Sequence, residues 1–241
     1  MKKVLIWSRR LLALLLVLLG AAWIFADASQ WLLRWRAEGM LADIQSLKVN
    51  QSTSAQGQSL LRKWSHWGEI QTYCREGTCQ HFVILRHILP TILQGNPDRN
   101  AINCLPILID FIGLRSAGVG AGFSEENGVV TEKGFSEMVH VPVRDWYLRG
   151  DAYVPDLVVS ANEVHKFGDH EEYYVRPSQP FRLARYMKGP YGVIVKFKPE
   201  ESTSEQAALM NFQFSCITQL VPCRSERDIL PEGWQLLQEK Y

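Results

Sequence analysis

The chain has 241 residues, of which 46% are hydrophobic and 21% charged, with 26 lysines and arginines against 25 acidic residues. This composition excludes intrinsic disorder, collagen and disulfide-dense miniproteins, and the length suits one ordinary domain or two small ones behind a targeting segment. Four bases and no acid lie in residues 1–26, so the remainder carries 22 bases and 25 acids. A mildly acidic body has no electrostatic footprint for nucleic acid, and we expect no nucleic-acid partner.

The N-terminus is basic and then apolar, as in segments that engage a membrane. Four cations precede the apolar stretch: Lys2, Lys3, Arg9 and Arg10. The sixteen residues 11–26 carry no charge. As a helix they would span about 24 Å, slightly less than the ~30 Å hydrocarbon core of a bilayer. A cleaved signal peptide fits this short length and the small residues Ala26 and Ala28.

An uncleaved anchor fits two other features. Tryptophans stand at both ends of the apolar stretch, as in the interfacial belts of membrane helices: Trp7, Trp23, Trp31 and Trp35. Past Asp27, apolar residues continue on one helical face: Leu33, Ala37, Met40, Leu41, Ile44 and Leu47. A cut between Ala28 and Ser29 would fall at the start of this helix. We therefore favour a membrane anchor over 1–26, a membrane-proximal amphipathic helix over 27–50 and an exported domain over 51–241.

The charge pattern predicts the orientation of this anchor. Basic residues before the span outnumber those that follow it closely, Arg34 and Arg36, so the N-terminus should stay cytoplasmic. The C-terminal domain is then periplasmic or extracellular, and the lipid bilayer is the first expected partner. No cysteine follows the apolar run, which excludes a lipid-modified N-terminal cysteine.

The cysteines fit an oxidising compartment. Cys74 and Cys79 flank a turn at Gly77 between two strand-like segments, which predicts a disulfide across the base of a hairpin. Cys216 and Cys223 form the second predicted pair. Neither spacing is that of a zinc site. Cys104 is left over; we expect it to be buried and inert, with competition for one of the other four cysteines as the alternative.

The pattern along the body predicts short helices and many strands. Capping-box pairs at Thr53 with Gln56 and at Ser202 with Glu205 predict two helices, and a third is expected from Ser225 to near Tyr241. Asn127-Gly128 predicts a hairpin turn. Strands or extended segments are expected over 69–73, 80–85, 105–115, 129–141, 153–159, 173–176, 181–187, 193–198 and 212–220. This order predicts an α+β domain, with short helices packed on a mainly antiparallel sheet.

Asp110 is the first suspect for catalysis if the protein is an enzyme. It lies in an apolar segment and shares a strand face with Leu108 and Ile112, and a buried carboxylate must find a partner or take up a proton. Candidate partners are Arg144, Arg182 and Arg185. A structural ion pair, or a strand face open to solvent, is the alternative interpretation that we favour.

Other motifs carry weaker signals. The densest group of potential metal ligands is His165, Asp169, His170, Glu171 and Glu172. Its histidine spacing does not place two imidazoles on one helical face, so we expect a solvated acidic loop and no metal, with a weak divalent-cation site at His165, Asp169 and His170 as the alternative. The glycines at 118, 120 and 122 lack the spacing of a dinucleotide loop and predict close backbone packing in a strand. Gly-Phe-Ser-Glu occurs at 122–125 and 134–137. The two copies lack the second glycine of a nucleophile elbow and read as hairpin arms.

No family identifies itself across the chain. The segment 47–85, with its capped tryptophan-containing helix and hairpin, resembles the small helix-plus-sheet modules of bacterial envelope lipoproteins, and no functional residue carries over. Because no complete catalytic set is visible, we expect no cofactor and an exported binding or scaffolding domain, with an envelope protein as partner. The alternatives are an anchored hydrolase with a carboxylate or serine site, and a secreted module that binds a small ligand.

Overall fold

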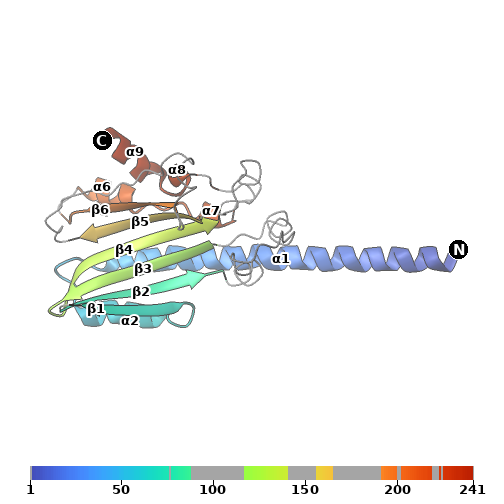
Figure 1. The fold of residues 1–241 in the computed structure, drawn as a ribbon, viewed down its shortest axis with the longest axis horizontal. Helices are drawn as coiled ribbons and strands as arrows, with labels where there is room; N and C mark the ends of the chain where they lie inside the picture. The colour runs from blue at the N-terminus through green and yellow to red at the C-terminus, as the bar shows by residue number, and fades with distance from the viewer. Residues whose placement is uncertain are drawn as a thin grey trace.

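The computed structural model describes residues 2–75, 77–87, 117–140, 156–164, 191–199, 202–218, 223 and 225–240. In this part of the chain, a long helix, α1 (Lys2–Ser46), is followed by α2 (Ser54–Trp64) and by six strands (Figure 1). The strands are β1 (Glu69–Arg75), β2 (Thr78–Arg86), β3 (Ala117–Glu126), β4 (Val129–His140), β5 (Asp156–Val164) and β6 (Tyr191–Phe197). The short helices α6 (Thr203–Leu209), α7 (Ser215–Thr218), α8 (Glu226–Ile229) and α9 (Pro231–Lys240) follow.

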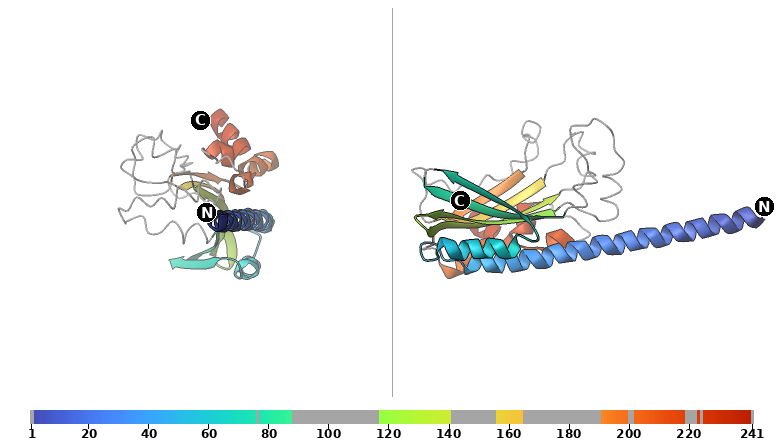
Figure 2. Two further views of the ribbon diagram at one scale, coloured as in Figure 1. Left: turned by 90° about the vertical axis from the view of Figure 1, so that its right-hand side faces the viewer. Right: turned by 90° about the horizontal axis from the view of Figure 1, so that it is seen from below.

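The six strands form one sheet in the order β1-β2-β3-β4-β5-β6. Neighbours are antiparallel except β5 and β6, which are parallel. Figure 2 shows the second half of α1 and all of α2 on one face of this sheet. This arrangement confirms the predicted α+β class.

Helix α1 is continuous across the predicted boundary between residues 26 and 27. Its first half projects from the domain (Figures 1 and 2) and exposes its apolar side chains, whereas its second half buries one face in the core. The buried residues match the predicted face: Leu33, Ala37, Met40, Leu41, Ile44 and Leu47. Among the described residues, α1 is long and apolar enough to cross a membrane, with a mean hydropathy of 2.3 in its candidate span.

Helix α2 begins as predicted. Thr53 accepts a hydrogen bond from the backbone of Gln56, and the Gln56 side chain accepts one from the Thr53 backbone, which completes the capping box. The helix ends at Trp64. Gly68, between this helix and β1, lies against the sheet, where a Cβ atom would come within 2.6 Å of the Ile84 carbonyl oxygen.

Strands β3 and β4 form the predicted hairpin. Asn127 and Gly128 have φ angles of 52° and 78°, and both therefore lie in the left-handed region that a tight hairpin turn requires. The two Gly-Phe-Ser-Glu copies are the arms of this hairpin, with Gly122 directly opposite Gly134. A Cβ atom at Gly122 would come within 2.5 Å of the Phe82 ring, so close packing explains this glycine.

Several predicted boundaries were wrong. Strand β5 continues to Val164, past the predicted end at Val159, and β6 begins at Tyr191, before the predicted start at Val193. The predicted start of β5 at Tyr153 lies outside the described residues. The segment 212–220 was expected to be extended, but it contains α7. The alternation of buried Phe212, Phe214 and Cys216 imitates a strand, because a half-buried strand also buries every second residue.

The predicted C-terminal helix is two helices, α8 and α9. The second starts at Pro231, whose missing N–H and fixed φ suit a first helical position and not a helix interior. The expected strands 105–115, 173–176 and 181–187 lie outside the described residues.

Candidate functional site

The structure places both predicted cysteine pairs at disulfide-bonding distance. Cys74 lies directly opposite Cys79 on β1 and β2, with 4.1 Å between their Cα atoms. Cys216 of α7 is bonded to Cys223, which comes just before α8. Cys104 lies outside the described residues, so its expected inert state stays a prediction.

The other predicted site residues also lie outside the described part of the chain. These are Asp110, with its candidate arginine partners, and the possible ligands His165, Asp169 and His170. Among the described residues, no group of three or more His, Cys, Asp or Glu side chains could hold a metal ion. The structure instead shows polar groups that the sequence did not single out.

The first of these is a fully buried carboxylate, Glu137, on the face of β4 that α1 covers. Its side chain is 0% exposed, and neither carboxylate oxygen has a hydrogen-bond partner among the described residues. Burial raises the pKa of Glu137 well above its ordinary value, and the positive charge of Arg34 opposes this shift. Glu137 is therefore the kind of buried acid that the sequence suggested at Asp110. The sequence signal for its burial was its position two residues from Phe135 and Val139, which places all three side chains on the same face of a strand.

The second is a buried ion pair at the far end of α1. Lys133 and Glu163 lie opposite each other on β4 and β5, with 3.0 Å between Nζ and Oε2. The Lys133 ammonium also donates to the backbone oxygens of Leu47, at 2.6 Å, and Gln45, at 3.2 Å. These are carbonyls at the end of α1, where the helix dipole favours a cation. The pair fastens the helix to the sheet.

The third is a hydrogen-bonded series beside the Cys74–Cys79 disulfide. His81 Nε2 lies 3.1 Å from Glu125 Oε1, and His81 Nδ1 lies 3.1 Å from the Thr72 hydroxyl. A hydrogen bond with Ser54 and the contact with His81 hold the pKa of Glu125 below its ordinary value, although burial opposes this. When Nε2 carries the proton, Nδ1 accepts from Thr72, which is the relation of a base to a hydroxyl nucleophile.

This series also has a structural role. His81 is buried and stacks on the Phe123 ring, with 4.9 Å between ring centroids. Ser54 is the first residue of α2, so the Glu125 carboxylate faces the positive end of that helix. The series thus joins α2, β1, β2 and β3.

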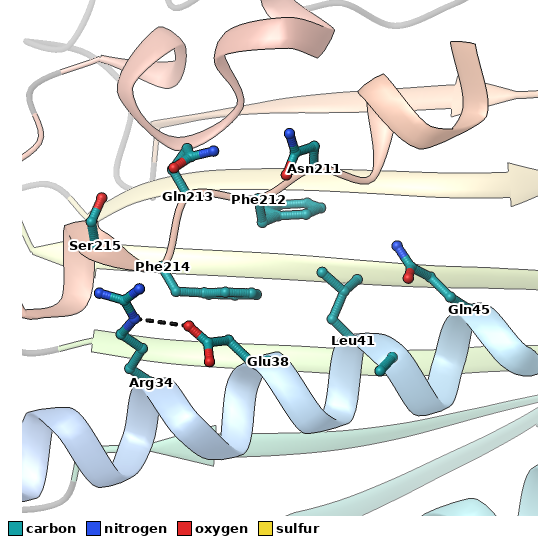
Figure 3. A pocket seen from close by; sticks show the side chains of 10 residues that line it. Arg34, Glu38, Leu41, Gln45, Asn211, Phe212, Gln213, Phe214 and Ser215 are labelled. Atoms are coloured by element: carbon teal, nitrogen blue, oxygen red, sulfur yellow. Dashed lines mark hydrogen bonds and ion pairs between the residues drawn. The ribbon is translucent and has the colours of Figure 1, made fainter. Parts of the chain in front are cut away.

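An open groove of about 350 Å³ lies between α1 and the segment 211–215. Phe212, Phe214 and Leu41 form the apolar floor of this groove, and Figure 3 shows the two rings opposite the Leu41 side chain. Polar side chains surround this apolar floor: Arg34, Glu38 and Gln45 on α1, and Asn211, Gln213 and Ser215 opposite. Arg34 and Glu38 form an ion pair at 2.8 Å. Amide side chains can both donate and accept, so this rim suits the backbone of an extended peptide.

No protein-family model, curated protein or solved structure matches this sequence or fold.

Proposed function

We propose that this is a single-span membrane protein whose exported α+β domain binds an envelope partner and holds it near the membrane. One observation carries the proposal: the helix that exposes its apolar first half also packs one face of its second half in the core of the domain. Because one continuous helix joins the proposed span to the domain, the domain keeps a fixed distance from the membrane and a fixed orientation to it. Rigid attachment suits positioning and assembly.

The orientation in this proposal follows from charge. Lys2, Lys3, Arg9 and Arg10 keep the N-terminus in the cytoplasm, and the domain lies on the oxidising side, where its disulfides persist. In the host, carbonate extraction should leave the protein in the membrane. Protease added outside spheroplasts should digest the domain, whereas protease-resistant or freely soluble protein would contradict the proposal.

The groove beside α1 is the proposed binding surface. Ala42 lines it and is exposed, so Ala42→Trp should fill the groove without disturbing the core. Ala55, exposed on α2, gives the matched control Ala55→Trp. A defined partner crosslinked to the wild type and the control, but lost from Ala42→Trp, is the expected result. Equal crosslinking by both variants would remove the groove from the proposal.

An anchored hydrolase is the second candidate, favoured by the Thr72–His81–Glu125 series. Thr72→Val removes the hydroxyl but keeps the shape of the side chain. If the series is catalytic, this variant should lose turnover of an ester or peptide substrate while its melting temperature changes little. Unchanged turnover would leave the series with its structural role alone.

A further inference from the structure

One face of α1 stays apolar and exposed after the helix has entered the domain. At 100° per residue, five residues lie opposite the buried face. We name them the outer stripe: Ile24, Ala28, Trp31, Leu32 and Trp35. The side chains of Trp31 and Trp35 are 53% and 69% exposed. Beyond the outer stripe, the same face carries Glu38, Ala42, Gln45 and Ser46, so the apolar surface ends at Trp35.

Cations and one further tryptophan flank the outer stripe. The Arg34 guanidinium lies 5.1 Å from the centroid of the Trp31 ring, and that of Arg36 lies 3.8 Å from Trp67. Trp67 is 54% exposed and comes from the turn between α2 and β1. Figures 1 and 2 place this turn at the end of the domain from which α1 projects. The surface is thus aromatic and cationic beside the proposed span.

The exposed apolar part of α1 spans a bilayer only if the outer stripe is included. From Leu11 to Phe25 the helix is exposed on all sides, but these residues span only ~22 Å, too little for a ~30 Å hydrocarbon core. Extended along the outer stripe to Trp35, the apolar length reaches ~37 Å. A helix of that length fits the core at a tilt of about 35°, within the range of membrane helices.

We propose that α1 crosses the bilayer at such a tilt and that lipid covers the outer stripe, with acyl chains against Ile24 and Ala28 and the headgroup layer against Trp31, Trp35 and Trp67. The exported domain then rests its flank on the membrane, with the sheet turned away from the lipid. This inference rests on the proposed anchor. Tryptophan rings favour the headgroup region, and the two guanidinium groups complement lipid phosphates.

A second copy of α1 is a poorer occupant for the same surface. Helices that pack together in membranes approach each other through small residues. The outer stripe instead presents Trp31, Leu32 and Trp35, which would hold two helices apart. Lipid adapts to such bulky side chains.

Tryptophan fluorescence of the full chain in phosphatidylcholine–phosphatidylglycerol vesicles tests the inference. Lipids brominated near the headgroup quench buried rings, and iodide quenches rings in water. The emission of wild type minus that of Trp31→Phe/Trp35→Phe gives the contribution of Trp31 and Trp35. We expect brominated lipid to quench this contribution and iodide to leave it nearly unchanged. Trp234→Phe, on α9 away from the span, is the matched control, and its lost signal should not respond to brominated lipid.

Two results would overturn the inference while leaving the anchor intact. Either iodide quenches the Trp31 and Trp35 signal as strongly as free tryptophan, or neither quencher reaches it because another protein surface covers it. The anchor is tested separately with Trp23→Phe. If the signal lost in that variant is quenched by iodide and not by brominated lipid, the proposed function fails as well.

Discussion

At Glu137 the domain holds a carboxyl group in an apolar layer between Phe135 and Val139. Because burial raises its pKa in the folded state, the folded domain retains a proton that the unfolded chain releases. The stability linked to this proton is therefore fully present below the unfolded pKa and is lost as the pH rises through the folded pKa. The loss is about 1.4 kcal/mol per pH unit within that window.

We predict that Glu137→Gln stabilises the domain at neutral pH and flattens this dependence. Melting temperatures of the detergent-solubilised full chain, compared between mildly acidic and mildly alkaline buffers, would measure it. The exposed Glu126 gives the control Glu126→Gln, which should follow the wild type. Parallel curves for wild type and Glu137→Gln would show that the carboxyl group is not protonated in the folded domain.

The ion pair of Lys133 and Glu163 makes a different residue-scale prediction. Both side chains are 9% exposed, so Lys133→Met leaves a buried charge without its partner and should cost about 3–5 kcal/mol. The double variant Lys133→Met/Glu163→Met should recover most of that loss, because both charges are then absent. Denaturant titrations of the wild type, both single variants and the double variant give the coupling free energy. A double variant no more stable than Lys133→Met would contradict the expected coupling.

At the scale of single elements, Gly57 shows packing prevailing over helix propensity. Alanine in a helix interior is ordinarily favoured over glycine by ~1 kcal/mol. In α2, however, a Cβ atom at Gly57 would come within 2.5 Å of the buried Phe123 ring. The backbone must therefore lie close to the sheet at this point.

We predict that Gly57→Ala destabilises the domain by about 1–3 kcal/mol, the usual cost of overpacking. Gly20 lies in the exposed half of α1, where an added methyl group would meet nothing within 4 Å, so Gly20→Ala should cause no loss. Thermal unfolding followed by circular dichroism would compare the two. A stabilised Gly57→Ala would mean that α2 can move away from Phe123.

At the scale of the whole molecule, the redox state of the four paired cysteines tests the proposed export. Protein isolated from the host membrane should expose no alkylatable thiol from Cys74, Cys79, Cys216 or Cys223 until a reductant is added. Replacing Cys74 and Cys79 by serine should cost only ~1–2 kcal/mol, because the closed loop is short. Mass spectrometry of alkylated peptides measures the redox state of the four cysteines, and denaturant titration measures the stability lost in the Cys74→Ser/Cys79→Ser variant. Free thiols at these four positions would contradict export.

The sequence alone determined the features that depend on local pattern. The apolar stretch, the capping boxes at Thr53 and Ser202, the turn at Asn127-Gly128 and both cysteine pairs follow from neighbouring residues, because caps, turns and short loops are closed by local geometry. Tertiary structure decided that α1 is one rod, that β5 and β6 run parallel and that Glu137 is buried. These three features depend on contacts between elements that are far apart in the sequence. The alternation of apolar and polar residues in one strand does not show which helix or strand packs against each of its faces.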